Sequence, residues 1–127
     1  QKTAYAMLRS LVGSEMCIRD REKGELSGND YNLRLILGDA RRTIKQFDTL
    51  VDCWFLDGFS PAKNPELWEE DLLKNVYRCT VNGGTLSTYS AAGYVRRNLS
   101  LAGFQVERIS GFGRKRHMTI ALKNDEK

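Results

Sequence analysis

Asp57 is the residue whose type and position in this chain most clearly suit chemistry. It follows an apolar run at residues 51–56 and precedes Gly58, which frees the backbone to turn. The apolar run predicts a buried strand, and open α/β sheets bind ligands just beyond the carboxyl ends of their strands. A carboxylate at this place can orient a polar group or accept a proton. A purely structural role, in which Asp57 caps the loop, is also compatible with the pattern.

Aromatic and polar residues near Asp57 extend this candidate site. Phe59 can stack on a ligand or fill the core, whereas Trp68 suits packing because it lies within a predicted helix that begins at Pro65. The triplet Gly38-Asp39-Ala40 ends another short apolar run, where amides and a carboxylate can hold a heterocycle or a ribose. A turn and a helix cap would use the same residues.

Basic residues gather late in the chain. They follow or precede predicted strands, so phosphate groups are a plausible partner, although a solvated surface is the usual role of such charges. The residues are Arg96, Arg97, Arg114, Lys115 and Arg116.

Strands and helices must alternate to position these side chains. Apolar runs predict strands at residues 33–37, 51–56, 85–89, 104–109 and 117–122, with helices at 40–47, from 65 and at 91–102. Residues 22–32 are polar and predict a loop, and Asn82-Gly83-Gly84 predicts a stop and turn. This order predicts βαβ units, with the 51–56 strand covered on both faces and the last two strands paired as an antiparallel hairpin.

Composition bounds the class of protein. The chain has 127 residues, enough for one domain, with 41% hydrophobic and 28% charged residues and a net charge of +4. No apolar run approaches the roughly 18 residues that span a bilayer. Cys17, Cys53 and Cys79 form no CxxC pair, so we expect small buried side chains in a reducing cytoplasm rather than a zinc site. The sequence shows no P-loop, no metal-ligand cluster and no Ser/His/Asp order.

The first residues look foreign to the rest. Residues 10–21, with the core Met16-Cys17-Ile18-Arg19-Asp20, resemble the conceptual translation of a transposon-type sequencing adapter. We therefore expect residues 1–21 to be a chimeric segment and the gene's own sequence to occupy residues 22–127. A short amphipathic helix and a targeting peptide are the alternatives.

From residue 35 to residue 122 the chain resembles the methyltransferase domain of the MnmC family. The resemblance is carried by several motifs in the same order, of which the longest is residues 54–68, and its loop at residues 57–68 is close to a family signature by itself. The others are Leu37-Gly38-Asp39-Ala40, Gly83-Gly84-Thr85-Leu86-Ser87-Thr88-Tyr89, Ala91-Ala92-Gly93-Tyr94-Val95-Arg96-Arg97, Ala102-Gly103-Phe104 and Gly111-Phe112-Gly113-Arg114-Lys115-Arg116.

The resemblance implies an α/β protein of the Rossmann-like S-adenosylmethionine-dependent methyltransferase fold. The implied reaction methylates the aminomethyl arm of a modified wobble uridine in tRNA, giving 5-methylaminomethyl-2-thiouridine. Gly38, Asp39 and Ala40 match the segment that contacts the adenine end of the cofactor. Asp57 and Phe59 match the active-site loop, and Asp57 also borders the cofactor. With the basic residues above, we assign Lys63 and Asn64 to the tRNA contact.

Two departures from the family pattern limit what carries over. The Gly-rich loop and acidic strand end that bind the methionine and ribose of the cofactor would lie upstream of the adapter-like segment, together with the first two strands. His117 stands where the family has an acid. We therefore expect a truncated domain, unstable or inactive by itself, that would use FAD only through a fused oxidase half. The rival functions are a Rossmann-like N-methyltransferase with another substrate and a non-enzymatic RNA-binding fragment.

Overall fold

The computed structural model describes residues 25–57 and 60–125, so the predictions for residues 1–21, for Gly58 and for Phe59 lie outside the described residues. The chain divides into two compact units, Gln1–Asp39 and Ala40–Lys127. Each unit is described by itself below. No helix of the described residues is long and apolar enough to cross a membrane.

The described part of the first unit is a small antiparallel ribbon. Strand β1 (Glu25–Ser27) pairs with β2 (Asn32–Arg34), and Leu26 stands opposite Leu33. The amide of Gly28 donates to the carbonyl of Tyr31 at 2.8 Å and closes the turn between the strands. The predictions of a loop at 22–32 and a strand at 33–37 were therefore wrong in detail. The turn lets residues 25–27 pair with residues 32–34. Strand β2 ends at Arg34, before the apolar residues 35–37.

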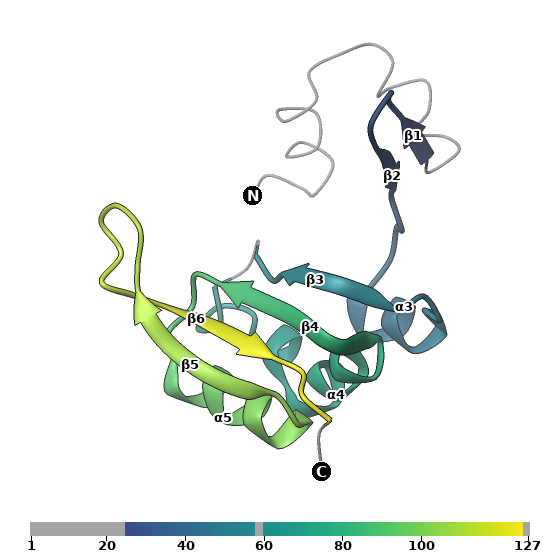
Figure 1. Ribbon diagram of the computed structural model, residues 1–127. Coiled ribbons are helices and arrows are strands. Elements are labelled where there is room, and N and C mark those ends of the chain that lie inside the picture. The colour runs from purple at the N-terminus through teal and green to yellow at the C-terminus, as the bar shows by residue number, and fades with distance from the viewer. Residues whose placement is uncertain (1–24, 58–59, 126–127) are drawn as a thin grey trace. The chain divides into compact units, whose positions relative to one another are not determined.

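A four-stranded mixed sheet organises the second unit (Figure 1). Its order is β3 (Val51–Phe55), β4 (Thr80–Thr88), β6 (His117–Leu122) and β5 (Gln105–Ser110). Strand β3 runs parallel to β4, while β6 is antiparallel to both β4 and β5. The predicted hairpin of the last two strands is confirmed. It forms because Gly111–Arg116 is too short for a crossover helix.

The helices of the second unit follow the predicted alternation. Helix α3 (Ala40–Gln46) precedes β3, a 3-10 turn η1 (Pro65–Trp68) leads into α4 (Glu70–Arg78), and α5 (Gly93–Ala102) lies between β4 and β5. The predicted helix from Pro65 is thus two pieces, with a break at Glu69, whose backbone is extended. Acidic residues Glu70 and Asp71 occupy the first turn of α4, where they suit the positive end of the helix dipole.

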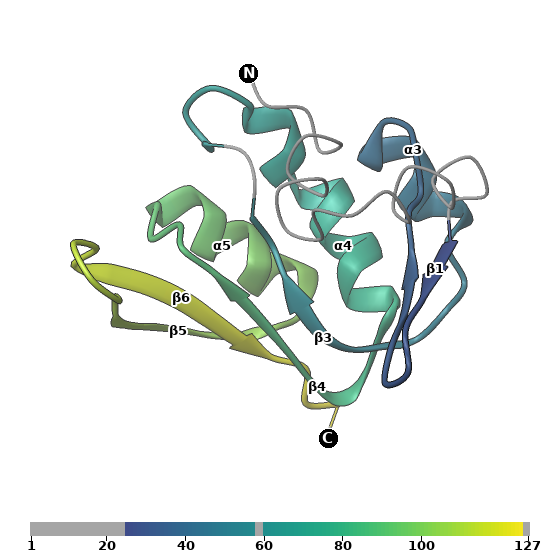
Figure 2. The same cartoon turned by 90° about the horizontal axis from the view of Figure 1, so that it is seen from above.

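The core lies between these helices and one face of the sheet (Figures 1 and 2). Leu73 of α4 and Leu99 of α5 are completely buried and pack with Leu86 of β4 and Phe104. Trp68 is also buried, which confirms its predicted packing role. Helix α5 ends at Gly103, whose φ of 120° favours glycine, and a Cβ there would meet the ring of Tyr77 at 2.9 Å.

The described residues of the second unit leave the opposite face of the sheet uncovered. Phe55 of β3 is 79% exposed, and Cys53 is exposed, whereas Cys79 at the end of α4 is buried. The expectations that the 51–56 strand is covered on both faces and that Cys53 is buried were therefore wrong for this unit. An apolar run without polar alternation indicates that both faces of a strand can be buried. It does not indicate which element covers each face.

The Asn82-Gly83-Gly84 segment lies inside β4, so the predicted stop was wrong. Val51 pairs with Thr80 but Cys53 pairs with Thr85, and the extra residues of β4 form a bulge between these pairs. The backbone of Lys123 bonds both glycines, accepting from Gly83 at 2.8 Å and donating to Gly84 at 2.9 Å. Glycines in a strand commonly mark such a bulge.

Candidate active site at the carboxyl ends of β3 and β4

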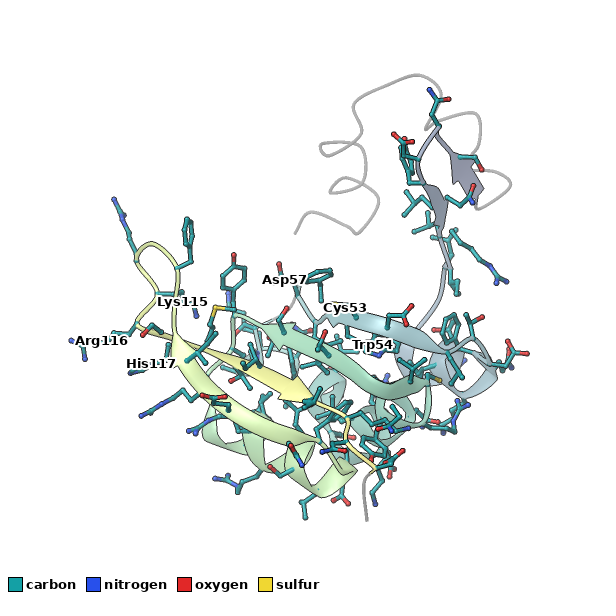
Figure 3. The ribbon with its side chains drawn as sticks, viewed as in Figure 1. Cys53, Trp54, Asp57, Lys115, Arg116 and His117 are labelled. Atoms are coloured by element: carbon teal, nitrogen blue, oxygen red, sulfur yellow. The ribbon has the colours of Figure 1, made fainter. Side chains whose placement is uncertain are left out.

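Asp57 lies where the two parallel strands end together. The amide of Leu56 donates to the carbonyl of Ser87 at 2.9 Å, so β3 is held against β4 until one residue before Asp57. Figure 3 shows Asp57 at this end of β3, as the sequence predicted. Its side chain is exposed. Asp57 therefore lies at the end of a parallel strand pair, and the described residues do not shield its side chain from water.

A hydroxyl network stiffens the neighbouring end of β4. Thr88 Oγ1 accepts from the amide of Ser90 at 3.2 Å, and Ser90 Oγ accepts from the amide of Ala92 at 3.3 Å. Thr119 of β6 is completely buried and donates to the carbonyl of Ser90 at 2.7 Å. These bonds direct the chain from β4 into α5. Sequence reasoning missed them, although Ser and Thr after a strand and before a helix are the residues that make such local bonds.

The loop after Asp57 is attached to α5. Backbone amides of Lys63 and Asn64 both donate to the carbonyl of Ser60, at 3.0 and 2.9 Å, which makes a tight turn. Tyr94 of α5 donates its hydroxyl to the carbonyl of Pro61 at 2.7 Å. Partial burial, followed by the charge of Glu66, raises the pKa of Tyr94, so the phenol keeps the proton that this bond requires.

A second attachment lies at the far end of the loop. The side-chain amide of Asn98 donates to the carbonyl of Trp68 at 2.9 Å. Tyr94 and Asn98 are four residues apart and therefore share one face of α5. Sequence reasoning identified neither residue as part of the site, because nothing local to either one shows that it bonds a loop some 30 positions away.

The cofactor candidates at residues 38–40 span the boundary between the units. Gly38 and Asp39 belong to the first unit and Ala40 begins α3 of the second. Gly38 has φ of 141°, a conformation that glycine adopts without strain, and all three residues are exposed.

The basic candidates fall into three groups. Arg114, Lys115 and Arg116 are exposed in the turn between β5 and β6, which is closed by the amide of Gly111 donating to the carbonyl of Arg116 at 3.1 Å. Figure 3 shows Lys115 and Arg116 at this turn and His117 at the start of β6. Arg96 and Arg97 lie on α5. Lys63, exposed, and Asn64, half-buried, lie in the loop after Asp57.

A groove of about 660 Å³ crosses the uncovered face of the sheet. Its lining includes Cys53, Ser87, Glu107 and Ile120, and none of the predicted site residues takes part. In the described part of the chain, no group of three or more His, Cys, Asp or Glu side chains is arranged to hold a metal ion.

Comparison with known proteins agrees with this architecture. The sequence model of a family described as S-adenosyl-L-methionine-dependent methyltransferase matches residues 4–124. The crystal structure of MNMC2 from Aquifex aeolicus superposes with a TM-score of 0.70 at 32% identity, covering 86% of this chain and 37% of that one. The predicted Rossmann-like methyltransferase fold is thereby confirmed.

Two bacterial relatives carry one name, tRNA 5-methylaminomethyl-2-thiouridine biosynthesis bifunctional protein MnmC. The protein of Ectopseudomonas mendocina (strain ymp) is 48% identical over 93 residues, covering 73% of this chain and 14% of the relative. That of Ralstonia nicotianae (strain GMI1000) is 52% identical over 89 residues, covering 70% and 14%. The chain thus spans about 14% of the length of these relatives. The match over residues 4–124 shows that this chain belongs to the S-adenosyl-L-methionine-dependent methyltransferase family.

Proposed function

We propose that the chain is part of an enzyme that transfers a methyl group from S-adenosylmethionine to the aminomethyl nitrogen of a wobble uridine in tRNA. The product is 5-methylaminomethyl-2-thiouridine, and the reaction takes place in the cytoplasm. The observation that carries the proposal is the 43–52% identity to proteins named for biosynthesis of this nucleoside. Family membership supports the donor, and the position of Asp57 supports the site of transfer.

Methyl transfer requires the attacking amine to be uncharged. A primary alkylamine has a pKa of about 10.4 by analogy with lysine, so near pH 7 it is protonated and cannot attack. Neutralising it costs roughly 3 to 3.5 pKa units, about 4–5 kcal/mol. Burial of an amine lowers its pKa by up to about 3–5 units, so a site that excludes water can meet this cost.

Asp57 contributes through its position beside the amine rather than through the pKa of the amine. A carboxylate beside an amine favours the charged form, so Asp57 does not lower the pKa of the amine. It orients the nitrogen and accepts its proton as the new C–N bond forms. Because the side chain is exposed, we assign the exclusion of water to the bound RNA base. Phe59, which lies outside the described residues, is assigned to stacking on the base.

The residues at 38–40 fit the donor chemically. The Asp39 carboxylate can accept a hydrogen bond from the exocyclic amine of adenine, and both Gly38 and Asp39 are exposed. When bound, the donor supplies a methyl group on a positively charged sulfur. No metal is required for this transfer.

The tRNA is assigned to the basic groups. The exposed turn at Arg114, Lys115 and Arg116, the α5 arginines and the Lys63–Asn64 turn each offer donors to phosphate or ribose oxygens. Their separation over three elements suits a large, extended ligand better than a small molecule.

The experiment uses a chimeric protein, which we call the graft. The 93-residue segment of the Ectopseudomonas mendocina relative that matches this chain is replaced by the chain's own residues. Transfer of labelled methyl from S-adenosylmethionine to undermodified tRNA is then measured. We expect transfer to the wobble uridine in tRNA that carries the aminomethyl group and none in tRNA that lacks it.

Two outcomes would overturn the proposal. Methylation of a small amine or a protein, with tRNA unmodified, would give the chain another substrate. Binding of tRNA that does not respond to S-adenosylmethionine, with no transfer by a folded graft, would make it a non-enzymatic RNA-binding segment.

A further inference from the structure

A second groove lies on the other side of the second unit from the uncovered sheet face. It has a volume of about 560 Å³ and runs between α5 and β5, which neighbour each other in Figure 1. Its charged lining consists of Arg96, Arg97 and Arg108, and no carboxylate of the described residues lines it. Arg108 was not singled out by sequence reasoning.

The helical spacing of α5 and the alternation of β5 place these three arginines along one groove. Gly93, Arg96, Arg97 and Ser100 recur at helical spacing on one face of α5, whereas Val95 and Leu99, both completely buried, point into the core. On β5, Arg108 lies on the same side as the half-buried Val106, two residues before it. Glu107 lies between them and lines the groove on the opposite face. The alternation of the strand thus removes the nearest carboxylate from the arginines.

The electrostatics of the groove call for an anion. Three guanidinium groups line one hollow without a balancing acid among the described residues. The Nε of Arg96 is buried and lacks a hydrogen-bond partner in the described part of the chain. A buried donor without a partner costs free energy, which shows that the internal contacts of the unit do not satisfy this guanidinium fully.

The ligand chemistry follows from the donors. A guanidinium presents parallel N–H groups that match two oxygens of a phosphate, and arginine is favoured where such recognition matters. Nη1 of Arg97 lies 3.4 Å from the position of a Cβ on Gly93, in the first turn of α5, so the cation stands close to the positive end of that helix. Both features favour a dianionic or diester phosphate over a neutral ligand.

We propose that the groove between α5 and β5 is a phosphate-binding site, formed by Arg96, Arg97 and Arg108, that holds one backbone phosphate of the RNA substrate. The assignment to RNA rests on the proposed function, whereas phosphate binding by the groove does not. The site is separate from the basic turn at 114–116, so it supplies an additional point at which the RNA is oriented.

The test uses two probes on the full chain. Inorganic phosphate is titrated while the amide resonances of Gly93 and Ser100 are followed by NMR. Binding of tRNA is then measured as a function of salt. The variant is Arg96→Gln with Arg108→Gln, and the matched control is Arg42→Gln with Lys45→Gln, which removes two exposed charges from α3. Circular dichroism confirms that each variant is folded.

The expected result is saturable phosphate shifts at Gly93 and Ser100 in the parent chain and the control, and their loss in the Arg96/Arg108 variant. The slope of log Kd against log salt for tRNA should decrease by about 1 in the groove variant and stay unchanged in the control.

The outcomes separate the two parts of the proposal. Phosphate shifts with an unchanged tRNA slope would mean that the groove binds a free phosphate anion and not RNA. Absence of shifts in the folded parent chain would overturn the site itself. A graft that transfers no methyl, with both readouts as expected, would overturn the proposed function and leave the groove assignment standing.

Discussion

The hydroxyl of Tyr94 donates a 2.7 Å hydrogen bond to the carbonyl of Pro61, and through it α5 holds the loop that follows Asp57. The two residues are 33 positions apart. The raised pKa of Tyr94, caused first by burial and then by Glu66, keeps the donor protonated at neutral pH. The position of the candidate site therefore depends on a helix that carries none of the predicted catalytic residues.

Replacing Tyr94 with Phe should loosen this loop. The variant loses one hydrogen bond, worth about 0.5–1.5 kcal/mol, and leaves the Pro61 carbonyl to water. Amide exchange of Lys63 and Asn64, measured by NMR, should become faster by up to about tenfold. Tyr89→Phe, at a 47% exposed position, is the control. Equal exchange in both variants would mean that the loop is held by other contacts.

Asp57→Asn should reduce methyl transfer in the active graft by roughly 10²–10⁴, the usual contribution of a general acid–base group. Affinity for S-adenosylmethionine should change little, because the amide keeps the shape of the side chain. Asp52→Asn, an exposed position on β3, serves as control. Near-normal turnover of the Asp57 variant would remove this residue from catalysis.

Leu99→Ala should destabilise the second unit strongly. Leu99 is completely buried in the core, and truncation of such a residue costs about 2–5 kcal/mol because it leaves a cavity. Leu101→Ala removes the same atoms from the same helix at a 63% exposed position and should have a small effect. Urea unfolding compares the two free energies. Similar losses would contradict the described packing of α5.

Thr80→Val should destabilise β4 through an unpaired donor. Thr80 is buried, accepts from Trp54 Nε1 at 2.9 Å and donates to the carbonyl of Val76 at 2.6 Å. The isosteric valine leaves the indole N–H without its partner, at a cost of about 1–3 kcal/mol. Thr85→Val, at an exposed position on the same strand, should be neutral or stabilising. Thermal unfolding at matched protein concentration decides between these outcomes.

Stability should fall at high pH through Tyr77. Its hydroxyl donates to the carboxylate of Asp125, and this bond, followed by burial and the charge of Asp125, raises the pKa of Tyr77. The folded state therefore holds the proton more tightly than the unfolded chain, so the contribution is present below about pH 10 and is lost as pH rises through the raised value. The difference in unfolding free energy between the parent and Tyr77→Phe should shrink above that pH. A constant difference would contradict the assignment.

Much of the fold could be read from local pattern because the deciding forces are local. The helical spacing of Leu73 and Val76, and of Val95 and Leu99, matches the faces that the structure buries. Gly103 ends α5, because its positive φ suits a helix C-terminus. The short connection at 111–116 allowed only a hairpin.

The predictions from sequence were wrong where contacts with residues far apart in the chain determine the local structure. Asn82-Gly83-Gly84 has the composition of a turn, yet pairing with β3 and the Lys123 backbone draws it into β4 as a bulge. Cys53 is a residue type that is usually buried, yet it is exposed on β3, because no described element of the second unit covers that face. Local propensity cannot register either fact, because tertiary contacts override it.

The candidate site shows the same division. The sequence alone determined that a carboxylate, Asp57, follows an apolar strand and that arginines recur on α5, since both depend on order and spacing along the chain. Only the tertiary structure decided that Tyr94 and Asn98 hold the loop and that Arg108 joins Arg96 and Arg97 in one groove. The physical reason is that hydrogen bonds and grooves are made by side chains brought together in space, and the separation of such partners along the chain carries no local signal.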